Sequence, residues 1–334
     1  MSTPKVSVIG AGGWGTALAL LMAKRGLEVA IWGHDPAHVQ SMRTEGENSK
    51  YLPSVPLSPL IRPTTSLEEC VVGEILFLAV PSSHLRSVSA LLAEAGLGEN
   101  TILLSCTKGI ERERGLLMSE VLGETLPGVP VAVLSGPNLA GEIGRGIPAA
   151  GVIGCADPEL LPQLQALFEG TSFRAYTSSD VRGIQLGGAL KNVFAVAAGV
   201  SDGMGLGENA RAGLVTRSLA EMTRLGVAMG GYPGTFGGLS GVGDLMVTCF
   251  STQSRNHQVG FRLGSGESLS EVTGSMTMVA EGIPTTISAH ACARRLNLET
   301  PIIDEVYALI HGEKTANQAM KALMARQLRS EEAL

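Results

Sequence analysis

Six residues near the N-terminus, Gly10-Ala11-Gly12-Gly13-Trp14-Gly15, follow the pattern G-x-G-x-x-G. Glycines at this spacing permit a tight turn, let the backbone approach a pyrophosphate and let a helix pack closely on a strand. The helix that follows presents free N–H groups and the positive end of its dipole to the phosphates. The pattern predicts a dinucleotide site whose contacts are Gly10, Gly12, Gly13, Trp14 and Gly15.

A second candidate group lies far along the chain, where Lys191 is the single charge in the run Leu186–Val196. On a helix, Gly187 and Gly188 fall one turn before this lysine and on the same face. Two glycines cost helix stability there, and we interpret them as room for a ligand beside the ammonium. A lysine desolvated in this way can act as an acid or base near neutral pH. A lysine that reaches solvent from a buried helix explains the pattern equally well.

A dinucleotide site of this kind needs a strand, a helix and a second strand around the glycines. Lys5–Ile9 is a short β-branched run typical of a buried strand, Thr16–Arg25 reads as a helix, and Glu28–Trp32 reads as the second strand. Later apolar runs predict further strands at Glu74–Val80, Thr101–Ser105, Val131–Leu134 and Ala150–Ile153, with a helix at Ser82–Ala95. The alternation indicates an α/β fold with a mostly parallel, Rossmann-type doubly wound sheet.

Strand-like runs disappear after about residue 178, and helical patterns at 214–230 and 283–296 replace them. We therefore predict two domains. Residues 1–178 form a dinucleotide-binding Rossmann domain, and residues 179–334 form a mainly α-helical substrate and catalytic domain.

The end of the second strand bears on the choice of cofactor. NAD enzymes often place a carboxylate at this tip to hold the ribose 2′-OH. Here Asp35 comes late, behind Gly33 and His34. The missing carboxylate removes a repulsion against a 2′-phosphate, and His34 can contact that phosphate or the adenine. We predict that NADPH is accepted, alone or alongside NADH, so that the cofactor is NADP or NAD, with a solvated loop residue as the alternative interpretation of His34.

Composition excludes several other classes of protein. The chain has 334 residues and a net charge of −6, without a basic stretch, which argues against a nucleic-acid partner. No segment reaches the roughly 20 apolar residues of an integral membrane span. The five scattered cysteines fit small core residues in a reducing cytoplasm. His34 and His38 are four residues apart, but Pro36 lies between them and no other ligand is near, so we predict no metal site.

Segments along nearly the whole chain resemble the bacterial NAD(P)-dependent sn-glycerol-3-phosphate dehydrogenases. In order, they are GAGGWGTALA from Gly10, IWGHDP from Ile31, LSCTKGI from Leu104, SGPNLAGE from Ser135, LGGALKNVFAVAAGVSDGMGLGENARAGLVTRSLAEM from Leu186, GVGDLMVTC from Gly241, SRNHQVG from Ser254 and VAEG from Val279. The resemblance implies reversible hydride transfer between dihydroxyacetone phosphate with NAD(P)H and sn-glycerol 3-phosphate with NAD(P)⁺, which supplies phospholipid synthesis. It also implies a cofactor and substrate held between the two domains, and it suggests a homodimer.

The resemblance assigns roles to the matching positions. Lys191 matches the catalytic residue, which gives a proton to the carbonyl oxygen as hydride arrives and takes one from the C2 hydroxyl in reverse. Asp244 matches a carboxylate that orients the lysine and a substrate hydroxyl, and Lys108 adds positive charge near the developing alkoxide. Substrate contacts fall on Lys108, Gly136, Asn138, Lys191, Asp244, Ser254, Arg255 and Asn256. Cofactor contacts fall on His34, Lys108, Ala140, Arg255, Val279 and Glu281.

One position departs from the pattern of the family. Many relatives carry Ser or Thr where this chain has Asn138. An amide can replace a hydroxyl as donor or acceptor, but it reaches further. The substrate contact expected at Asn138 therefore depends on how that longer side chain is placed.

Two other functions compete with this interpretation. A 3-hydroxyacid or 6-phosphogluconate-type dehydrogenase also joins a Rossmann domain to a helical domain that carries a catalytic lysine, but the SRN and VAEG segments favour glycerol phosphate. A catalytically inactive NAD(P)-binding sensor would have a damaged site. Lys108, Lys191, Asp244 and Arg255 are all of the expected type.

Overall fold

The computed structural model describes residues 4–276, 279–328 and 330 of the chain. It divides into two compact units, which we describe one at a time. The first unit comprises Met1–Lys108 and Leu117–Gln185, and the second comprises Gly109–Leu116 and Leu186–Leu334. The functional domains expected at residues 1–178 and 179–334 remain a prediction.

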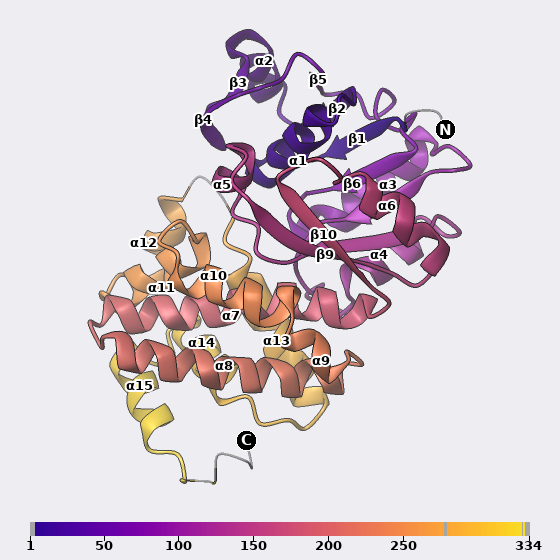
Figure 1. The fold of residues 1–334 in the computed structure, drawn as a ribbon. Coiled ribbons are helices and arrows are strands. Elements are labelled where there is room, and N and C mark those ends of the chain that lie inside the picture. The colour runs from indigo at the N-terminus through magenta and orange to yellow at the C-terminus, as the bar shows by residue number, and fades with distance from the viewer. Residues whose placement is uncertain (1–3, 277–278, 329, 331–334) are drawn as a thin grey trace. The chain divides into compact units, whose positions relative to one another are not determined.

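Eight short strands form the main sheet of the first unit within the described residues (Figure 1). They are β1 (Val6–Ile9), β2 (Val29–Trp32), β5 (Ile61–Thr64), β6 (Ile75–Leu78), β7 (Ile102–Ser105), β8 (Val131–Ser135), β9 (Ala149–Cys155) and β10 (Phe173–Ser178). Their order is β10-β9-β8-β7-β6-β1-β2-β5. Neighbours are parallel, except that β9 runs antiparallel to β8. The mostly parallel, Rossmann-type sheet is confirmed.

Helices cover both faces of this sheet (Figure 1). α1 (Gly13–Lys24) and α6 (Leu161–Ala166) lie on one face. α3 (Leu85–Ala95) and α4 (Met118–Thr125) lie on the other. The remaining elements of the unit are α2 (Pro36–Glu45), the hairpin of β3 (Glu47–Asn48) and β4 (Leu52–Pro56), α5 (Ala140–Gly144), and 3₁₀ turns at Ser82–His84 and Pro158–Leu160.

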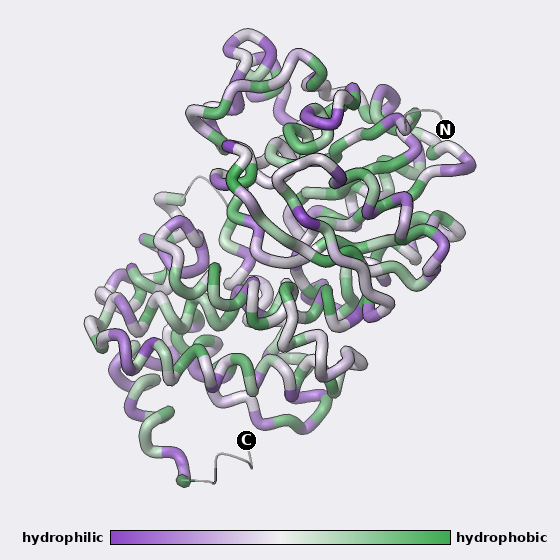
Figure 2. Tube along the Cα trace, viewed as in Figure 1, coloured by the Kyte–Doolittle hydropathy of each residue, from purple (hydrophilic) through white to green (hydrophobic). Residues whose placement is uncertain are grey.

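The centre of the sheet is apolar on both faces, as parallel sheets require. All four residues of β1 are buried. Val8 pairs in register with Ile31 on β2 and with Phe77 on β6, and these three side chains belong to one buried cluster. In Figure 2 the strands are accordingly hydrophobic along much of their length. The strand order reverses at β1, and open sheets of this kind bind ligands outside the carboxyl ends of the strands at such a point.

Every extended element of the second unit is a helix within the described residues, whereas Gly109–Leu116 holds a single bridge residue and turns. The predicted change from strands to helices is confirmed. Its elements are α7 (Val181–Gly203), whose first turn belongs to the first unit, α8 (Glu208–Ala228), α9 (Pro233–Phe236), a π-helical turn at Leu239–Gly243, α10 (Asp244–Phe250), α11 (Arg255–Gly264), α12 (Leu269–Gly274), α13 (Gly282–Arg295), α14 (Pro301–Ile310) and α15 (Ala316–Met324). α7 is long and apolar enough to cross a membrane, but its most apolar stretch lies wholly inside the protein. It is therefore a core helix.

All five cysteines are free and buried, as predicted for small core residues. Burial raises the pKa of Cys70 and of Cys249 to about 12. Thiols with such pKa values are protonated and unreactive at neutral pH.

A buried carboxylate ties α8 to α14 in the second unit. Glu221 on α8 accepts hydrogen bonds from the backbone N–H groups of Ile302 at 3.0 Å and Ile303 at 2.9 Å. These donors belong to the first turn of α14, where no intrahelical acceptor is available. Only 2% of Glu221 is exposed, and this burial raises its pKa to about 7 despite the two hydrogen bonds.

This raised pKa predicts a specific pH dependence of stability. Because the folded protein holds the Glu221 proton more tightly than the unfolded chain, the contribution of this group is present below pH 4.5 and is lost as the pH rises through about 7. Urea unfolding at several pH values should therefore show that Glu221→Gln loses less stability than the wild type between about pH 5 and 7. The exposed Glu94→Gln variant should keep the wild-type profile. Parallel profiles for Glu221→Gln and the wild type would contradict the assignment.

Candidate active site

The glycine-rich loop between β1 and α1 has the geometry of a phosphate cradle. Gly10 has a φ of +120°, and a Cβ on Gly15 would lie 1.9 Å from the carbonyl oxygen of Gly10, so neither position accepts a side chain. A Cβ on Gly12, by contrast, would meet nothing within 4 Å. No side chain caps α1, whose N-cap is Gly12. Open space in front of an uncapped helix N-terminus suits a pyrophosphate.

Trp14 and Ala140 lie at the same loop. The indole N–H of Trp14 is buried and has no hydrogen-bond partner among the described residues. A Cβ on Gly13 would lie 3.7 Å from the Cβ of Ala140, at the start of α5. The first unit thus gathers Ala140 with the glycine-rich loop, and the residues present fit a dinucleotide.

Three polar residues that sequence reasoning missed hold this loop in place. The Asn48 side chain is fully buried and donates to the carbonyl oxygen of Ala11 at 3.0 Å and to Thr16 Oγ1 at 2.7 Å. Thr16 Oγ1 donates in turn to the carbonyl oxygen of Gly12 at 2.9 Å. His38 Nε2 lies 3.2 Å from the same Ala11 oxygen. His38 is therefore part of the scaffold of the loop, and no group of three or more metal-ligating side chains occurs in the described residues.

The tip of β2 places His34 at the surface and Asp35 at the start of α2. His34 is exposed, whereas Asp35 is the N-cap of α2 and its Oδ1 accepts from the backbone N–H of Ala37 at 3.0 Å. The hydrogen bond from the backbone N–H of His38 is the largest cause that lowers the pKa of Asp35. The carboxylate is thus engaged in capping the helix.

The carboxyl ends of β7 and β8 bring together Lys108, Gly136 and Asn138. Lys108 Nζ donates to the carbonyl oxygen of Gly136 at 3.1 Å and to Asn138 Oδ1 at 2.8 Å. Gly136 has a φ of +131°, and a Cβ there would lie 2.8 Å from the Cα of Gly151. The side chain of Asn138 is longer than the Ser or Thr expected from the resemblance. It reaches Lys108 and accepts a hydrogen bond from its ammonium.

Lys191 on α7 lies in a buried polar cluster of the second unit. Its Nζ is 2.9 Å from Asp244 Oδ1 on α10 and donates to Thr248 Oγ1 at 2.6 Å. Lys191 is 7% exposed and Asp244 is 0% exposed. The side chain of Lys191 therefore does not extend to solvent. Because Asp244 and Thr248 fix the ammonium, its remaining N–H has a defined direction in which to donate a proton.

The expected role of Gly187 is wrong. A Cβ on this residue would lie 2.4 Å from the carbonyl oxygen of Ser240, in the π-helical turn that precedes α10. The glycine therefore admits protein backbone rather than a ligand. This close packing sets α10, which carries Asp244 and Thr248, against α7.

Ser254, Arg255 and Asn256 form the start of α11. Ser254 is the N-cap, and its Oγ accepts from the backbone N–H of His257 at 3.3 Å. Arg255 is exposed and donates to the carbonyl oxygen of Val279 at 2.9 Å. Glu281 lies near enough to interact electrostatically with the Arg255 guanidinium. The second unit thus gathers Arg255, Val279 and Glu281.

The side chain of Asn256 joins three segments of the second unit. It donates to Asn192 Oδ1 at 2.8 Å, next to Lys191 on α7. Its own Oδ1 accepts from the backbone N–H of Gly282 at 2.8 Å, at the start of α13. Asn256 is 8% exposed, so this amide is engaged with protein. Asn192 gave no sequence signal, because an amide next to a lysine is common on any helix.

Four glycines let α7 and α11 pack backbone to backbone. A Cβ on Gly199 or Gly203 of α7 would lie 2.0 or 2.1 Å from a carbonyl oxygen of α11, and a Cβ on Gly260 or Gly264 would lie 1.9 or 2.4 Å from a carbonyl oxygen of α7. We call these four residues the glycine seam. It sets the distance between the helix of Lys191 and the helix of Ser254 and Asn256.

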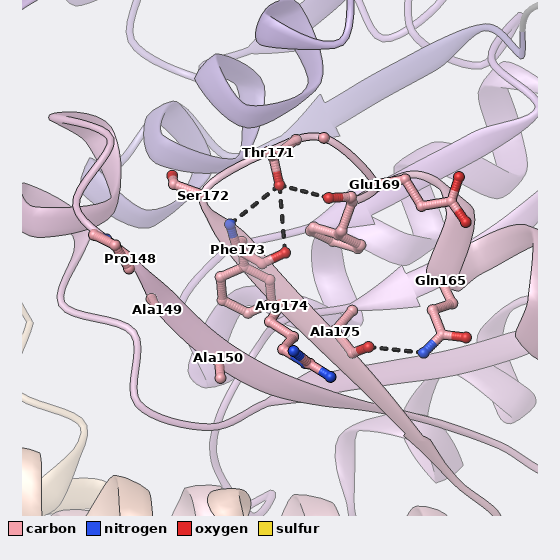
Figure 3. A pocket seen from close by; sticks show the side chains of 12 residues that line it. Pro148, Ala149, Ala150, Gln165, Glu169, Thr171, Ser172, Phe173, Arg174 and Ala175 are labelled. Carbon is pink, nitrogen blue, oxygen red and sulfur yellow. Dashed lines mark hydrogen bonds between the residues drawn. The ribbon is translucent and has the colours of Figure 1, made fainter.

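The first unit also has a hollow of about 730 Å³ (Figure 3). It is lined by residues of β9, β10 and the segment before β10, and no predicted site residue lines it. Gln165 donates to the carbonyl oxygen of Ala175 at 2.8 Å, and Thr171 donates to that of Phe168 at 2.7 Å. Two of its polar side chains thus bond to its own walls, whereas the buried Ser172 Oγ has no partner among the described residues.

Comparison with known proteins decides the family. The protein-family model for the N-terminus of NAD-dependent glycerol-3-phosphate dehydrogenase matches residues 5–161. The family model for the C-terminus matches residues 180–321. A glycerol-3-phosphate dehydrogenase (NAD(P)+) of Geobacter sulfurreducens is 47% identical over 331 residues, which cover 98% of each chain. The chain belongs to the NAD-dependent glycerol-3-phosphate dehydrogenase family. This membership confirms the resemblance inferred from the sequence.

Solved structures agree with this membership of the glycerol-3-phosphate dehydrogenase family. The crystal structure of glycerol-3-phosphate dehydrogenase from Coxiella burnetii matches with a TM-score of 0.93 and 35% identity, covering 97% of this chain and 99% of that one. A curated glycerol-3-phosphate dehydrogenase (NAD(P)+) of Desulfotalea psychrophila is 44% identical over 98% of this chain and 99% of its own. The 3-hydroxyacid dehydrogenase and the inactive sensor are not favoured.

Proposed function

We propose that Lys191 transfers the proton in the reaction of this enzyme, the reversible NAD(P)H-dependent reduction of dihydroxyacetone phosphate to sn-glycerol 3-phosphate. The observation that carries the role is the buried ammonium, 2.9 Å from Asp244 Oδ1 and 2.6 Å from Thr248 Oγ1. A general acid must point one N–H at the substrate oxygen, and two fixed acceptors orient the other N–H groups. In the reverse direction the same nitrogen takes the proton of the C2 hydroxyl.

Bound NAD(P)H supplies the hydride that reduces C2 of the substrate. In this proposal the first unit holds the cofactor through Gly10, Gly12, Gly13, Trp14 and Gly15, with Ala140 beside them and His34 at the ribose end. The uncapped N-terminus of α1 and the open space at Gly12 support this assignment of the glycine-rich loop. The second unit contributes Arg255, Val279 and Glu281, which lie together at the start of α11.

Lys108 stabilises the negative charge that develops on the substrate oxygen. Its ammonium is held by the carbonyl oxygen of Gly136 and by Asn138 Oδ1, so it needs little reorganisation when the charge forms. Gly136 contacts the substrate beside this lysine, and Asn138 acts by fixing the lysine as well as by contacting the substrate. Asp244 orients Lys191 and a substrate hydroxyl.

The start of α11 receives the phosphate of the substrate. Arg255 offers a forked guanidinium, and the first N–H groups of the helix point toward an anion placed there. Ser254 caps the helix and lies beside this position. The side chain of Asn256 is bonded to Asn192 and to the N–H of Gly282, so its part is to fix the segment and to offer its backbone N–H.

The proposal extends to organisation and location. Residues 1–178 serve as the cofactor-binding domain, and residues 179–334 serve as the substrate and catalytic domain. We place the enzyme in the cytoplasm, where its five free thiols stay reduced. The homodimer that the resemblance suggests is tested by light scattering of the purified protein.

The direct test is the oxidation of NADPH and of NADH by the purified protein with dihydroxyacetone phosphate, followed by absorbance. Rapid, substrate-dependent oxidation is the expected result. Cofactor binding without turnover of this substrate would overturn the proposal. Turnover of a 3-hydroxy acid in its place would favour the other dehydrogenase class, and no turnover of any keto phosphate would favour the sensor.

A further inference from the structure

The residue that distinguishes NADPH from NADH must lie where the adenosine ribose meets the tip of β2. In enzymes of this fold a carboxylate about 20 residues after the first glycine binds the ribose 2′-OH, whereas a cation there accommodates a 2′-phosphate. Asp35 is the only carboxylate between Gly33 and α2. Its Oδ1 caps α2, and its Oδ2 lies 3.9 Å from Lys50 Nζ in a partly exposed ion pair.

Lys50 belongs to the turn between β3 and β4, and that turn is fastened to the glycine-rich loop. Its neighbour Asn48 is bonded to Ala11 and Thr16, and Asn48 Oδ1 accepts from the backbone N–H of Tyr51 at 3.2 Å. The carbonyl oxygen of Tyr51 packs on Gly13, where a Cβ would approach it to 2.7 Å. The backbone of Lys50 is thus held relative to the loop that suits the pyrophosphate.

The ammonium of Lys50 is oriented but still accessible. It lies 5.1 Å from the centre of the Tyr51 ring and near Asp35, and 42% of its side chain is exposed. Among the described residues, Lys50 and His38 act electrostatically on Asp35, and the exposed His34 precedes that carboxylate in the chain. A ribose 2′-phosphate placed here would meet the Lys50 ammonium rather than a free carboxylate.

We infer that Lys50 is the specificity-determining residue that binds the 2′-phosphate of NADPH, with the Asp35 carboxylate 3.9 Å from its ammonium. The inference rests on the proposed cofactor role of the first unit, and it predicts that this enzyme prefers NADP(H) to NAD(H). A lysine binds a phosphate as a point charge with three donors, and such charge-assisted contacts are among the stronger hydrogen bonds.

Calorimetry with adenosine 2′,5′-bisphosphate and with 5′-ADP tests the contact without any turnover. The wild type should bind the bisphosphate more tightly than 5′-ADP. Lys50→Gln should reduce the ratio of the two affinities by about 10- to 100-fold, the usual effect of losing a hydrogen bond to a charged group. Lys50→Glu should reduce it further, and Lys50→Arg should retain most of it. The matched control is Lys24→Gln, at the far end of α1, which should leave the ratio unchanged.

Steady-state kinetics of the same variants with dihydroxyacetone phosphate gives the second measurement. In Lys50→Gln the ratio of kcat/KM for NADPH to that for NADH should fall in step with the binding ratio. An equal loss for both ligands, or no change in either ratio, would overturn the inference. Because the bisphosphate needs no substrate, failure of the proposed reaction would leave the binding result intact, and an active enzyme with an unchanged ratio would refute Lys50 alone.

Discussion

Replacing Lys191 by alanine is expected to lower kcat by about 10²- to 10⁴-fold, the usual contribution of a positioned acid–base group. The ammonium is the buried donor held by Asp244 and Thr248, so its removal leaves the alkoxide without a fixed source of protons. Binding of NADPH should change little, because the glycine-rich loop belongs to the first unit. Stopped-flow turnover and cofactor fluorescence measure the two quantities separately.

The Lys191 variant needs a control for folding, because it removes the charge that faces the buried Asp244 carboxylate. Breaking such a pair typically costs about 3–5 kcal/mol, whereas removing both charges together costs much less. Lys191→Met combined with Asp244→Asn should therefore recover stability without recovering turnover. Lys321→Ala, an exposed lysine on α15, should behave as the wild type. Near-normal turnover by a folded Lys191→Ala variant would show that another group carries the proton.

Replacing Gly260 by alanine is expected to destabilise the second unit by about 3 kcal/mol or more, at the upper end of overpacking effects. The new Cβ would lie 1.9 Å from the carbonyl oxygen of Val196, and backbone on both sides leaves no flexible side chain to move away. The helices must separate, which also shifts the start of α11 from Lys191. We therefore expect a lower midpoint of urea unfolding together with a lower kcat/KM for dihydroxyacetone phosphate.

Gly213 offers a matched control with the opposite sign. It is an exposed glycine inside α8, and a Cβ there would meet nothing within 4 Å. Gly213→Ala should stabilise the protein by about 0.5–1 kcal/mol, because alanine is the better helix former and has less freedom in the unfolded chain. If Gly260→Ala behaved like Gly213→Ala, the seam would not be under the packing constraint described here.

The sequence predicted the strands that lie inside the sheet and missed those at its margins. β1, β2, β6, β7 and β8 are short apolar runs, and burial on both faces makes such strands easy to recognise. β5 contains Pro63, and β10 has only Phe173 and Ala175 buried along its six residues. The reversed direction of β9 could not be predicted, because an apolar run carries no information about the direction in which it pairs.

The candidate site divides in the same way. The glycine pattern has a local signature, so the sequence alone predicts it. Asn48 and Asn192 act through partners 37 and 64 residues away, and nothing near them in the sequence marks that role. Gly187 was misinterpreted for the same reason, since its neighbour in the fold is Ser240.

The glycine seam also limits how this enzyme can diverge over generations. Because two main chains are already in contact, neither helix can slide or rotate to admit a bulkier ligand without losing the whole arrangement. New substrate preferences must then arise from side chains at helix ends and in loops, where substitutions cost little folding stability. In a library of random variants, surviving clones should keep Gly199, Gly203, Gly260 and Gly264 while sampling other residues freely around Arg255 and Val279.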